Sequence, residues 1–423
     1  MRMFVILALA CTAAHPAPAA APATLTASDV VALEAAGEFH LSGDGRSLVW
    51  VKTAADLERN LRRRTVYLTR LDGPETVQLT RGDDDRAPRF SIDGGKVGFV
   101  GKRGKDATPQ VYVLDLRGGE AEKVTSAATG VIAFDWLDAH TIVYAAREDS
   151  TLRERRLARD KDDVVVVADQ EHYPPVRLFR VDFSAKRTVR ITTNDGVIEE
   201  FALSPDRRRV VTRENQDVDF EYDYRTPPRQ FLTDLATGAR REIVPAPHVD
   251  IFDFKWDAAG KGFYCRRDIA SDSARTFVAI SQLYYYDVEA DSLHAVTDAW
   301  PQGLGGDYFP VAGGVVAALA DGVRDRIAFV EFAPDRRPIL RALHSDRSVR
   351  LVAAQPDGGR LVFFESTAST IPELMSARMR DGAFADKRRA IDLNEKPKER
   401  RLSRSQVARW AGPRRDTVEG ILY

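Results

Sequence analysis

The chain has 423 residues, with 62 lysines and arginines against 63 aspartates and glutamates, so its net charge is −1. This balance excludes the overall basic excess that is typical of nucleic-acid-binding proteins. Two cysteines are too few for a disulfide framework, and 44% hydrophobic residues are ordinary for a globular protein.

The first 23 residues have the pattern of a secretory signal peptide. Arg2 precedes an apolar segment over residues 4–14, and small residues fill positions 17–23. The apolar segment is too short to span a bilayer, and no later stretch is long and apolar enough for a membrane helix. We therefore expect cleavage near residues 19–23 and a periplasmic or secreted protein. A lipoprotein signal ending at Cys11 is the alternative.

Three segments stand apart from the pattern of the rest. Thr26 and Asp29 have the spacing of a capping box, which predicts a short helix over residues 30–35. Residues 54–64 and the highly charged residues 148–163 interrupt the strand pattern. We expect each of these two insertions to be an exposed loop or a short helix.

The central pattern is a short hairpin, best seen in residues 201–213, FALSPDRRRVVTR. Phe201 and Leu203 alternate with other residues as in a half-buried strand, and Pro205 and Asp206 suit the two corners of a tight turn. Val210 then begins the returning strand. One hairpin cannot bury its own apolar face, so it predicts a larger sheet structure.

The same hairpin recurs along the chain. Its turn positions are 44 to 68 residues apart, and they are Asp44, Asp93, Asp138, Asp206, Asp257, Gly313 and Asp357. Each copy is followed by a second alternating strand, a polar turn and a short return, as in residues 65–80 and 110–125. The repeat therefore predicts an all-β fold, a seven-bladed β-propeller of four-stranded antiparallel blades around a central channel.

Equivalent positions near the start of the blades carry large aromatic side chains. We expect these side chains to be buried between neighbouring blades; they are Phe90, Phe134, Trp136, Phe201, Phe254 and Trp256. Cys265 lies in a strand pattern, FYCRR, and is expected to be a small buried side chain with no disulfide partner.

The sequence contains no recognisable catalytic motif. Ser47 is the serine of the only Gly-x-Ser, residues 45–47, but Val49 occupies the second glycine position of a nucleophile elbow. The seven histidines are scattered and show no zinc-binding spacing. No phosphate-binding or dinucleotide-binding loop is present, so we expect no catalytic residue, no cofactor and no metal.

Some charged clusters allow a functional interpretation. The paired carboxylates of Glu199 and Glu200 are the candidates for binding a substrate amine, although ordinary charges at a strand edge are the favoured interpretation. The acidic residues 217–223 lack the spacing of a calcium loop and are expected to form a solvated loop. The basic residues 207–209 and 396–404 are expected to be solvated, and the second run is a candidate linker.

Several segments resemble one known family. QLTRGDDDRAPRFSIDGGKVGFVGKR at residues 78–103, VYVLDLRGGEAEKVT at 111–125 and FALSPDRRRVV at 201–211 resemble the N-terminal propeller of the prolyl oligopeptidase family of serine peptidases, in its acylaminoacyl-peptidase and dipeptidyl-aminopeptidase branch. WAGPRRDTVEGILY at 410–423 resembles the crossing into the α/β-hydrolase domain of that family. Propellers of the Tol system share such hairpins.

The resemblance implies a division of the chain and a role. Residues 1–23 would be the signal peptide, 24–393 the propeller, and 394–423 a linker and the start of an α/β-hydrolase domain. In the family the hydrolase domain supplies Ser, Asp and His, whereas the propeller gates access for peptide substrates. We therefore expect a truncated or split member that is inactive alone and pairs with a separate hydrolase domain. An independent Tol-like propeller that binds a protein partner is the alternative.

A last expectation concerns the C-terminal residues. Residues 417–423 have the composition of a strand whose sheet would be supplied by the hydrolase domain. We expect this strand to lack designed partners, and residues from about 396 onward to pack loosely or be disordered. An apolar patch is expected on the same face, near the helix predicted at residues 30–35.

Overall fold

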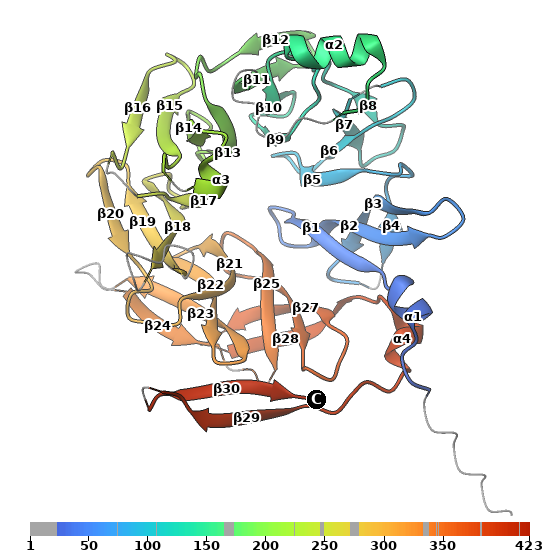
Figure 1. Cartoon of the computed structure of the whole chain (residues 1–423), viewed down its shortest axis with the longest axis vertical. Helices are drawn as coiled ribbons and strands as arrows, with labels where there is room; N and C mark the ends of the chain where they lie inside the picture. Colours follow the sequence, from blue (N-terminus) through green and yellow to red (C-terminus); the bar gives the residue numbers. More distant parts are fainter. Residues whose placement is uncertain are drawn as a thin grey trace, which may run out of the picture.

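The computed structural model describes residues 23–423 except 74, 107, 165–172, 224, 246–248, 271–278, 333–337, 344, 346, 381–382 and 414. The described chain is mostly β, and its sheets stand around a central opening (Figure 1). The all-β prediction is therefore confirmed. The predicted signal peptide, except for its last residue, and the alternative lipoprotein signal at Cys11 lie outside the described residues. Ala23 is described, and its carbonyl accepts a hydrogen bond from the Arg401 amide, at 2.9 Å.

Most sheets of the described residues are four-stranded antiparallel meanders in sequence order. They are β1 (Ala35–Leu41), β2 (Ser47–Asp56), β3 (Leu61–Arg70) and β4 (Thr76–Gln78); β5 (Arg86–Phe90), β6 (Lys96–Gly101), β7 (Gln110–Asp115) and β8 (Glu122–Lys123); β17 (Phe252–Trp256), β18 (Gly262–Ala270), β19 (Ala279–Asp287) and β20 (Ser292–Ala295); β21 (Leu304–Val311), β22 (Gly314–Asp321), β23 (Arg324–Phe332) and β24 (Pro338–Ala342); and β25 (Ser348–Ala354), β26 (Leu361–Ser366), β27 (Glu373–Arg380) and β28 (Ala383–Ile391).

One larger sheet holds eight strands. They are β9 (Ala133–Trp136), β10 (Thr141–Arg147), β11 (Val176–Asp182), β12 (Arg187–Arg190), β13 (Val197–Leu203), β14 (Arg209–Asn215), β15 (Arg229–Asp234) and β16 (Arg240–Ile243). A single parallel pair, Val176 with Val197, joins the β9–β12 half to the β13–β16 half. Each half is otherwise an antiparallel meander like the other sheets. The first strand of every such set lies nearest the centre of the ring (Figure 1).

The turns between first and second strands explain why the hairpins recur. In the turn after β13, the Asp206 carboxylate accepts hydrogen bonds from the Ser204 hydroxyl, at 2.6 Å, and the Arg208 amide, at 3.1 Å. Asp44 and Asp93 make the same pair of contacts in the turns after β1 and β5. These aspartates satisfy backbone donors that the tight turn leaves unpaired, so the repeated residue type specifies the repeated turn.

The predicted core positions are largely confirmed. Phe90, Phe134, Trp136, Phe254 and Trp256 are all at most 9% exposed. The remaining one, Phe201, is only partly buried, where it packs against the cluster that contains Val210. Cys265 is fully buried as expected, and burial raises the pKa of its thiol.

A second repeated contact holds the third strand of several sheets. Buried threonines accept a hydrogen bond from the backbone amide 14 residues earlier, at 2.9–3.0 Å. The pairs are Thr80 with Val66, Thr125 with Val111, Thr192 with Leu178 and Thr297 with Leu283. The Thr297 hydroxyl in turn donates to the Gln282 side chain, at 2.6 Å. The Thr297 hydroxyl therefore accepts a hydrogen bond from a backbone amide of the third strand, at a point beyond the end of the fourth strand.

Replacing Thr297 by valine tests this contact. Thr297 is 1% exposed, so Thr297→Val leaves the Leu283 amide buried and without its acceptor. We expect the free energy of unfolding to fall by about 1–3 kcal/mol in urea titrations. Thr237→Val is the control, because that threonine makes its hydrogen bonds in an exposed turn. Equal effects of the two substitutions would contradict the assigned role.

The β1–β4 and β25–β28 sheets close the ring through side chains. Among the described residues, no strand of one sheet pairs with a strand of the other. Trp50 and Leu71 instead share a hydrophobic cluster with Val362 and Leu374. The buried Arg360 guanidinium crosses the same junction, donating to the Leu71 carbonyl, at 3.3 Å, and to Asp72, at 2.6 Å.

The helices of the described residues are short and belong to none of the sheets. They are α1 (Ala27–Val31), α2 (Leu152–Asp160), α3 (Phe220–Asp223) and α4 (Glu395–Lys398). The capping box of Thr26 and Asp29 is confirmed, but the helix runs from residue 27 to 31 rather than from 30 to 35, because Thr26 itself is the N-cap. No helix among the described residues is both long and apolar enough to cross a membrane.

The two predicted insertions differ from each other. Residues 148–163 contain α2, whose capping box is formed by Thr151 and Glu154. Residues 54–64 are neither a helix nor mainly a loop, because β2 and β3 continue as a paired hairpin up to Asp56 and Leu61. The acidic residues 217–223 contain the single turn α3. Among the described residues, no group of three or more His, Cys, Asp or Glu side chains is placed to hold a metal ion.

Candidate functional site

Glu200 lies on β13 and connects two neighbouring sheets. Its carboxylate accepts hydrogen bonds from the backbone amides of Asp253, at 2.8 Å, and Phe254, at 2.5 Å, both on β17. Burial raises the pKa of Glu200, and the two amides oppose that shift. The side chain therefore has a clear structural role at the inner edge of the ring.

Glu199 faces different partners because the pairing of β13 with β14 shifts register between Ile198 and Glu200. Its carboxylate forms an ion pair with Arg213 and accepts a hydrogen bond from the Asn215 side chain, at 2.9 Å. Arg213 also binds Asp250 through two nitrogens, at 2.8 and 2.7 Å. A substrate amine would have to compete with this arginine, and amine binding by the two glutamates stays a prediction.

The pKa of Glu200 predicts a pH effect on stability. A raised pKa means that the folded protein binds this proton more tightly than the unfolded chain. The stabilisation is fully present below the ordinary Glu pKa of about 4.3 and is lost as the pH rises through the higher folded pKa. We therefore expect wild type to lose stability relative to Glu200→Gln as the pH rises from about 4 through the raised folded pKa of Glu200.

Urea unfolding of both proteins across this range measures the effect. The difference between the two curves isolates Glu200, because all other titrating groups are common to both proteins. A difference that stays constant with pH would contradict the assignment.

Charged side chains of both signs continue along the inner strands. The Lys255 ammonium lies 3.3 Å from Asp253 and 3.6 Å from Asp307, and the Arg266 guanidinium lies 2.7 and 3.3 Å from the same carboxylates. Two cations thus share two carboxylates between β17, β18 and β21. Sequence reasoning missed this cluster, because three members lie on two paired strands of one sheet and Asp307 comes from the next sheet.

A second inner cluster surrounds His40 on β1. Its Nδ1 accepts a hydrogen bond from the Phe90 amide, at 3.3 Å. Burial, with a contribution from Arg89, lowers the pKa of His40 to about 4, so the imidazole is neutral at pH 7. Nearby, Arg207 forms an ion pair with Asp135, at 3.1 Å. The first strands of these sheets and the turn after β13 therefore carry polar and charged side chains that have hydrogen-bond or ion-pair partners.

Ser47 does not occupy a catalytic environment. It is 4% exposed at the start of β2, and its hydroxyl accepts a hydrogen bond from Arg70, at 2.9 Å. A nucleophile must be reachable by substrate and hydrogen-bonded to a base, whereas this hydroxyl is buried against a cation.

The C-terminal residues form a hairpin that no propeller sheet contains. β29 (Gln406–Ala411) and β30 (Thr417–Leu422) pair over six residue pairs as a separate two-stranded sheet (Figure 1). The expectation that residues 417–423 lack a partner strand is therefore wrong. Their partner is β29, in the segment for which the sequence predicts a linker.

The segment leading to this hairpin is anchored rather than loose. The Asn394 side chain exchanges two hydrogen bonds with the Glu34 backbone, each at 2.8 Å. Arg400 forms an ion pair with Asp29, at 3.2 Å. These contacts tie the segment to the N-terminal residues, and the expectation of loose packing from residue 396 onward is wrong at Arg400.

The outer side of the hairpin is apolar and exposed. We call it the hairpin face, and it carries Trp410 and Leu422, which are 52% and 55% exposed, whereas Val407 and Ile421 lie on the opposite side of the hairpin. Trp410 lies over Gly420, where a Cβ would be 2.9 Å from the ring. Exposed apolar groups on a hairpin with unpaired edges are typical of an interaction surface.

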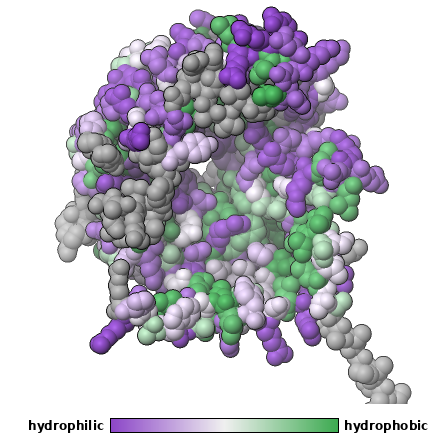
Figure 2. All heavy atoms as spheres, viewed as in Figure 1, coloured by the Kyte–Doolittle hydropathy of each residue, from purple (hydrophilic) through white to green (hydrophobic). Residues whose placement is uncertain are grey.

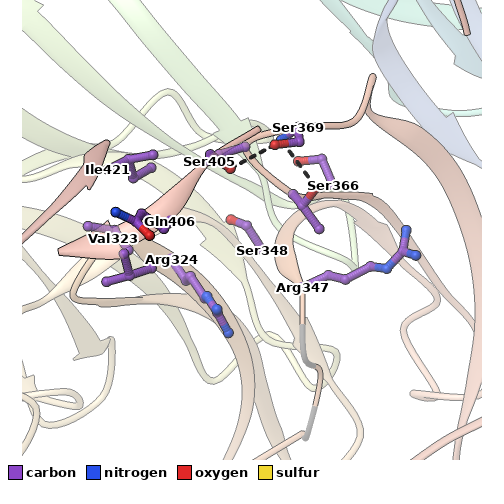
Figure 3. A pocket seen from close by; sticks show the side chains of 12 residues that line it. Val323, Arg324, Arg347, Ser348, Ser366, Ser369, Ser405, Gln406 and Ile421 are labelled. Carbon is purple, nitrogen blue, oxygen red and sulfur yellow. Dashed lines mark hydrogen bonds between the residues drawn. The ribbon is translucent and has the colours of Figure 1, made fainter. Parts of the chain in front are cut away.

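A cleft of about 280 Å³ separates the hairpin from the propeller (Figure 3). Its propeller side includes Ser348, Ser366 and Ser369, and its hairpin side includes Ser405 and Ile421. The Ser369 and Ser405 hydroxyls are 2.8 Å apart and join the two sides by a hydrogen bond. The Glu419 carboxylate of β30 also accepts a hydrogen bond from the Val323 backbone of the propeller.

The same apolar character extends to the neighbouring helix. Val30 and Val31 of α1 are 48% and 45% exposed. Figure 2 shows hydrophobic residues gathered on the side where α1 and the β1–β4 sheet lie, and it shows the face hollowed near its middle. The hairpin face and α1 together make the candidate docking site.

Comparison with known proteins shows which solved structures share this fold. No family model matches the chain. The β-propeller domain of the Trilobed protease from Pyrococcus furiosus aligns with a TM-score of 0.59 at 14% identity, over 86% of this chain and 97% of that domain. Acylaminoacyl peptidase from Pyrococcus horikoshii aligns with a TM-score of 0.62 at 16% identity, over 89% of this chain.

The structural neighbours are propeller domains of prolyl-oligopeptidase-family peptidases. The fold of this chain is therefore the fold of those domains. A curated relative, the uncharacterized peptidase YuxL of Bacillus subtilis (strain 168), is 26% identical over 156 residues, or 36% of this chain. The matches span 22% of that relative and 55% of the Pyrococcus horikoshii enzyme. No α/β-hydrolase part is present among the described residues.

Proposed function

We propose that the chain is the propeller portion of a prolyl-oligopeptidase-type serine peptidase and gates the access of small peptides to a hydrolase domain. The five four-stranded sheets and the two halves of the eight-stranded sheet support seven blades. In this proposal residues 24–393 are the propeller, and residues 394–423 lead into the hydrolase domain.

The observation that carries the proposal is the hairpin of β29 and β30. It follows the last propeller sheet, pairs with no propeller strand and exposes the hairpin face. Its unpaired edges leave backbone donors and acceptors that a further sheet would satisfy. A hydrolase domain would therefore extend this sheet and cover α1 and Trp410.

The inner strands supply the gating surface. Peptides carry an amine, a carboxylate and backbone amides, and the clusters around Asp253 and His40 offer charges of both signs. Glu199 is the more accessible candidate for the substrate amine, because the Glu200 carboxylate is held by two backbone amides. Signal-directed export to the periplasm or secretion belongs to the same proposal.

Reactivity toward a serine-directed fluorophosphonate probe tests the catalytic part. We expect the purified chain to remain unlabelled and to hydrolyse neither peptides nor esters, because Ser47 is buried. Activity that is lost in Ser47→Ala would overturn this part of the proposal.

The adjoining DNA and a docking assay test the partner. We expect a neighbouring coding sequence with Gly-x-Ser-x-Gly, then Asp, then His. Its product should bind this chain, and Trp410→Ser should weaken binding without changing the melting temperature, since Trp410 is 52% exposed. Asp93→Asn in a remote turn is the control. Absence of such a coding sequence would favour an independent binding propeller.

A further inference from the structure

A wide cavity lies between the β17–β20 and β21–β24 sheets. Its volume is about 870 Å³, within the range of small-molecule sites. The turns at residues 257–261 and 311–314 form part of its wall, together with side chains of β18, β19 and β23. None of the charged clusters described above lines it.

Three aromatic rings line the cavity, two from the paired strands β18 and β19 and one from β23 of the next sheet. The Tyr264 and Tyr285 rings have centroids 5.0 Å apart at an interplanar angle of 64°, and the Phe332 ring stacks on Tyr264 at 6.4 Å. Tyr264 is 4% exposed, so its ring is fixed in the wall. The faces of aromatic rings carry partial negative charge and attract cations.

The charged lining has the same preference. Among the described lining residues, Asp257, Asp287 and Asp298 contribute three carboxylates and Lys261 contributes one ammonium. The Asp257 carboxylate accepts the Tyr285 hydroxyl at 2.6 Å and the Gly262 amide at 3.1 Å, so it is held in one orientation. The cavity thus combines an apolar wall with an excess of negative charge.

The cavity and the hairpin lie at opposite ends of β22. Gly314, the first residue of the strand, lines the cavity, whereas Gly322, directly after the last, contacts Glu419 of β30. Eight residues of extended strand separate these ends by about 25 Å. A ligand in the cavity would therefore leave the candidate docking site free.

We propose that this cavity binds an organic ammonium ion that carries an apolar or aromatic group. The ammonium lies against the rings of Tyr264, Tyr285 and Phe332 and near the carboxylate of Asp257, while the apolar group fills the remaining wall. A free amine and the N-terminal residue of a peptide share this chemistry. The inference does not depend on the proposed peptidase role, because it uses neither the hairpin nor the inner strands.

Titration calorimetry with phenylalanine amide tests the proposal, with N-acetylphenylalanine amide as the uncharged counterpart. We expect the charged compound to bind at least about tenfold more tightly, since a cation on aromatic faces contributes on that scale. Phe-Ala-Ala amide distinguishes the sources: tighter binding of the tripeptide assigns the site to peptide N-termini, and weaker binding assigns it to free amines. Equal affinity for the charged and acetylated compounds would overturn the proposal.

Substitutions locate the binding. Phe332→Leu and Asp257→Asn should each weaken phenylalanine amide roughly tenfold. The matched controls are Phe364→Leu, in a half-buried ring of the β25–β28 sheet, and Asp93→Asn, in the corresponding turn after β5. Tyr285→Phe removes the hydroxyl but keeps the ring, so it should retain most of the affinity for phenylalanine amide. This variant tests the site independently if Asp257→Asn does not fold. Unchanged binding in Phe332→Leu would also overturn the proposal.

Discussion

Trp136→Ala is expected to lower the free energy of unfolding by about 3–5 kcal/mol, the range for removing a large aromatic side chain from a packed core. Trp136 is 1% exposed, on β9 against the β5–β8 sheet. Its indole donates to the Arg89 carbonyl, at 3.2 Å. A Cβ at Gly98 would lie 3.2 Å from the Trp136 ring, so the indole approaches the neighbouring backbone closely. Removing it leaves a cavity between two sheets.

The urea midpoint measures this loss, and Trp410→Ala provides the matched control. Both substitutions remove an indole, but Trp410 is 52% exposed on the hairpin face. We expect the control to shift the free energy of unfolding by less than about 1 kcal/mol. A similar loss in both variants would mean that the packing of Trp136 between two sheets is not the source of the loss in unfolding free energy.

Arg360→Met is expected to destabilise the protein by about 2–3 kcal/mol, because a buried charged donor loses several acceptors at once. Arg360 is 7% exposed and donates to the Leu71 carbonyl, to Asp72 and to the Ser376 hydroxyl, the last at 3.1 Å. Asp72 is half exposed, so its ion pair contributes less than a fully buried one. The buried Leu71 carbonyl and Ser376 hydroxyl account for most of the loss.

The control for this prediction uses the same carboxylate. Arg46 also approaches Asp72, at 3.9 Å, but its side chain is 72% exposed. We expect Arg46→Met to leave the thermal midpoint nearly unchanged, because exposed ion pairs contribute little. If Arg360→Met also left the thermal midpoint unchanged, the hydrophobic cluster around Trp50 and Leu71 alone would hold the two sheets together.

The repeat could be recognised in the sequence because its signals are local. A turn such as residues 204–208 needs one serine and one aspartate two positions apart, and the same bonds recur at Asp44 and Asp93. Burial of Phe90 and Trp256 follows from two-residue alternation beside such a turn. These signals predicted the sheets and their core, but not the partner strand β29, whose residues 406–411 are mostly exposed.

The contacts between repeats were decided by the tertiary structure. Glu199 and Glu200 are adjacent in sequence and were interpreted as one pair, yet a register shift directs one to Arg213 and the other to the amides of β17. The cavity at Tyr264 and Phe332 likewise joins residues of different sheets. Alternation and turn chemistry act over a few residues and are visible in the sequence. Packing between sheets joins residues about 50 positions apart or more, as Trp136 with Arg89 and Arg360 with Leu71, so it depends on how the completed sheets stand against each other.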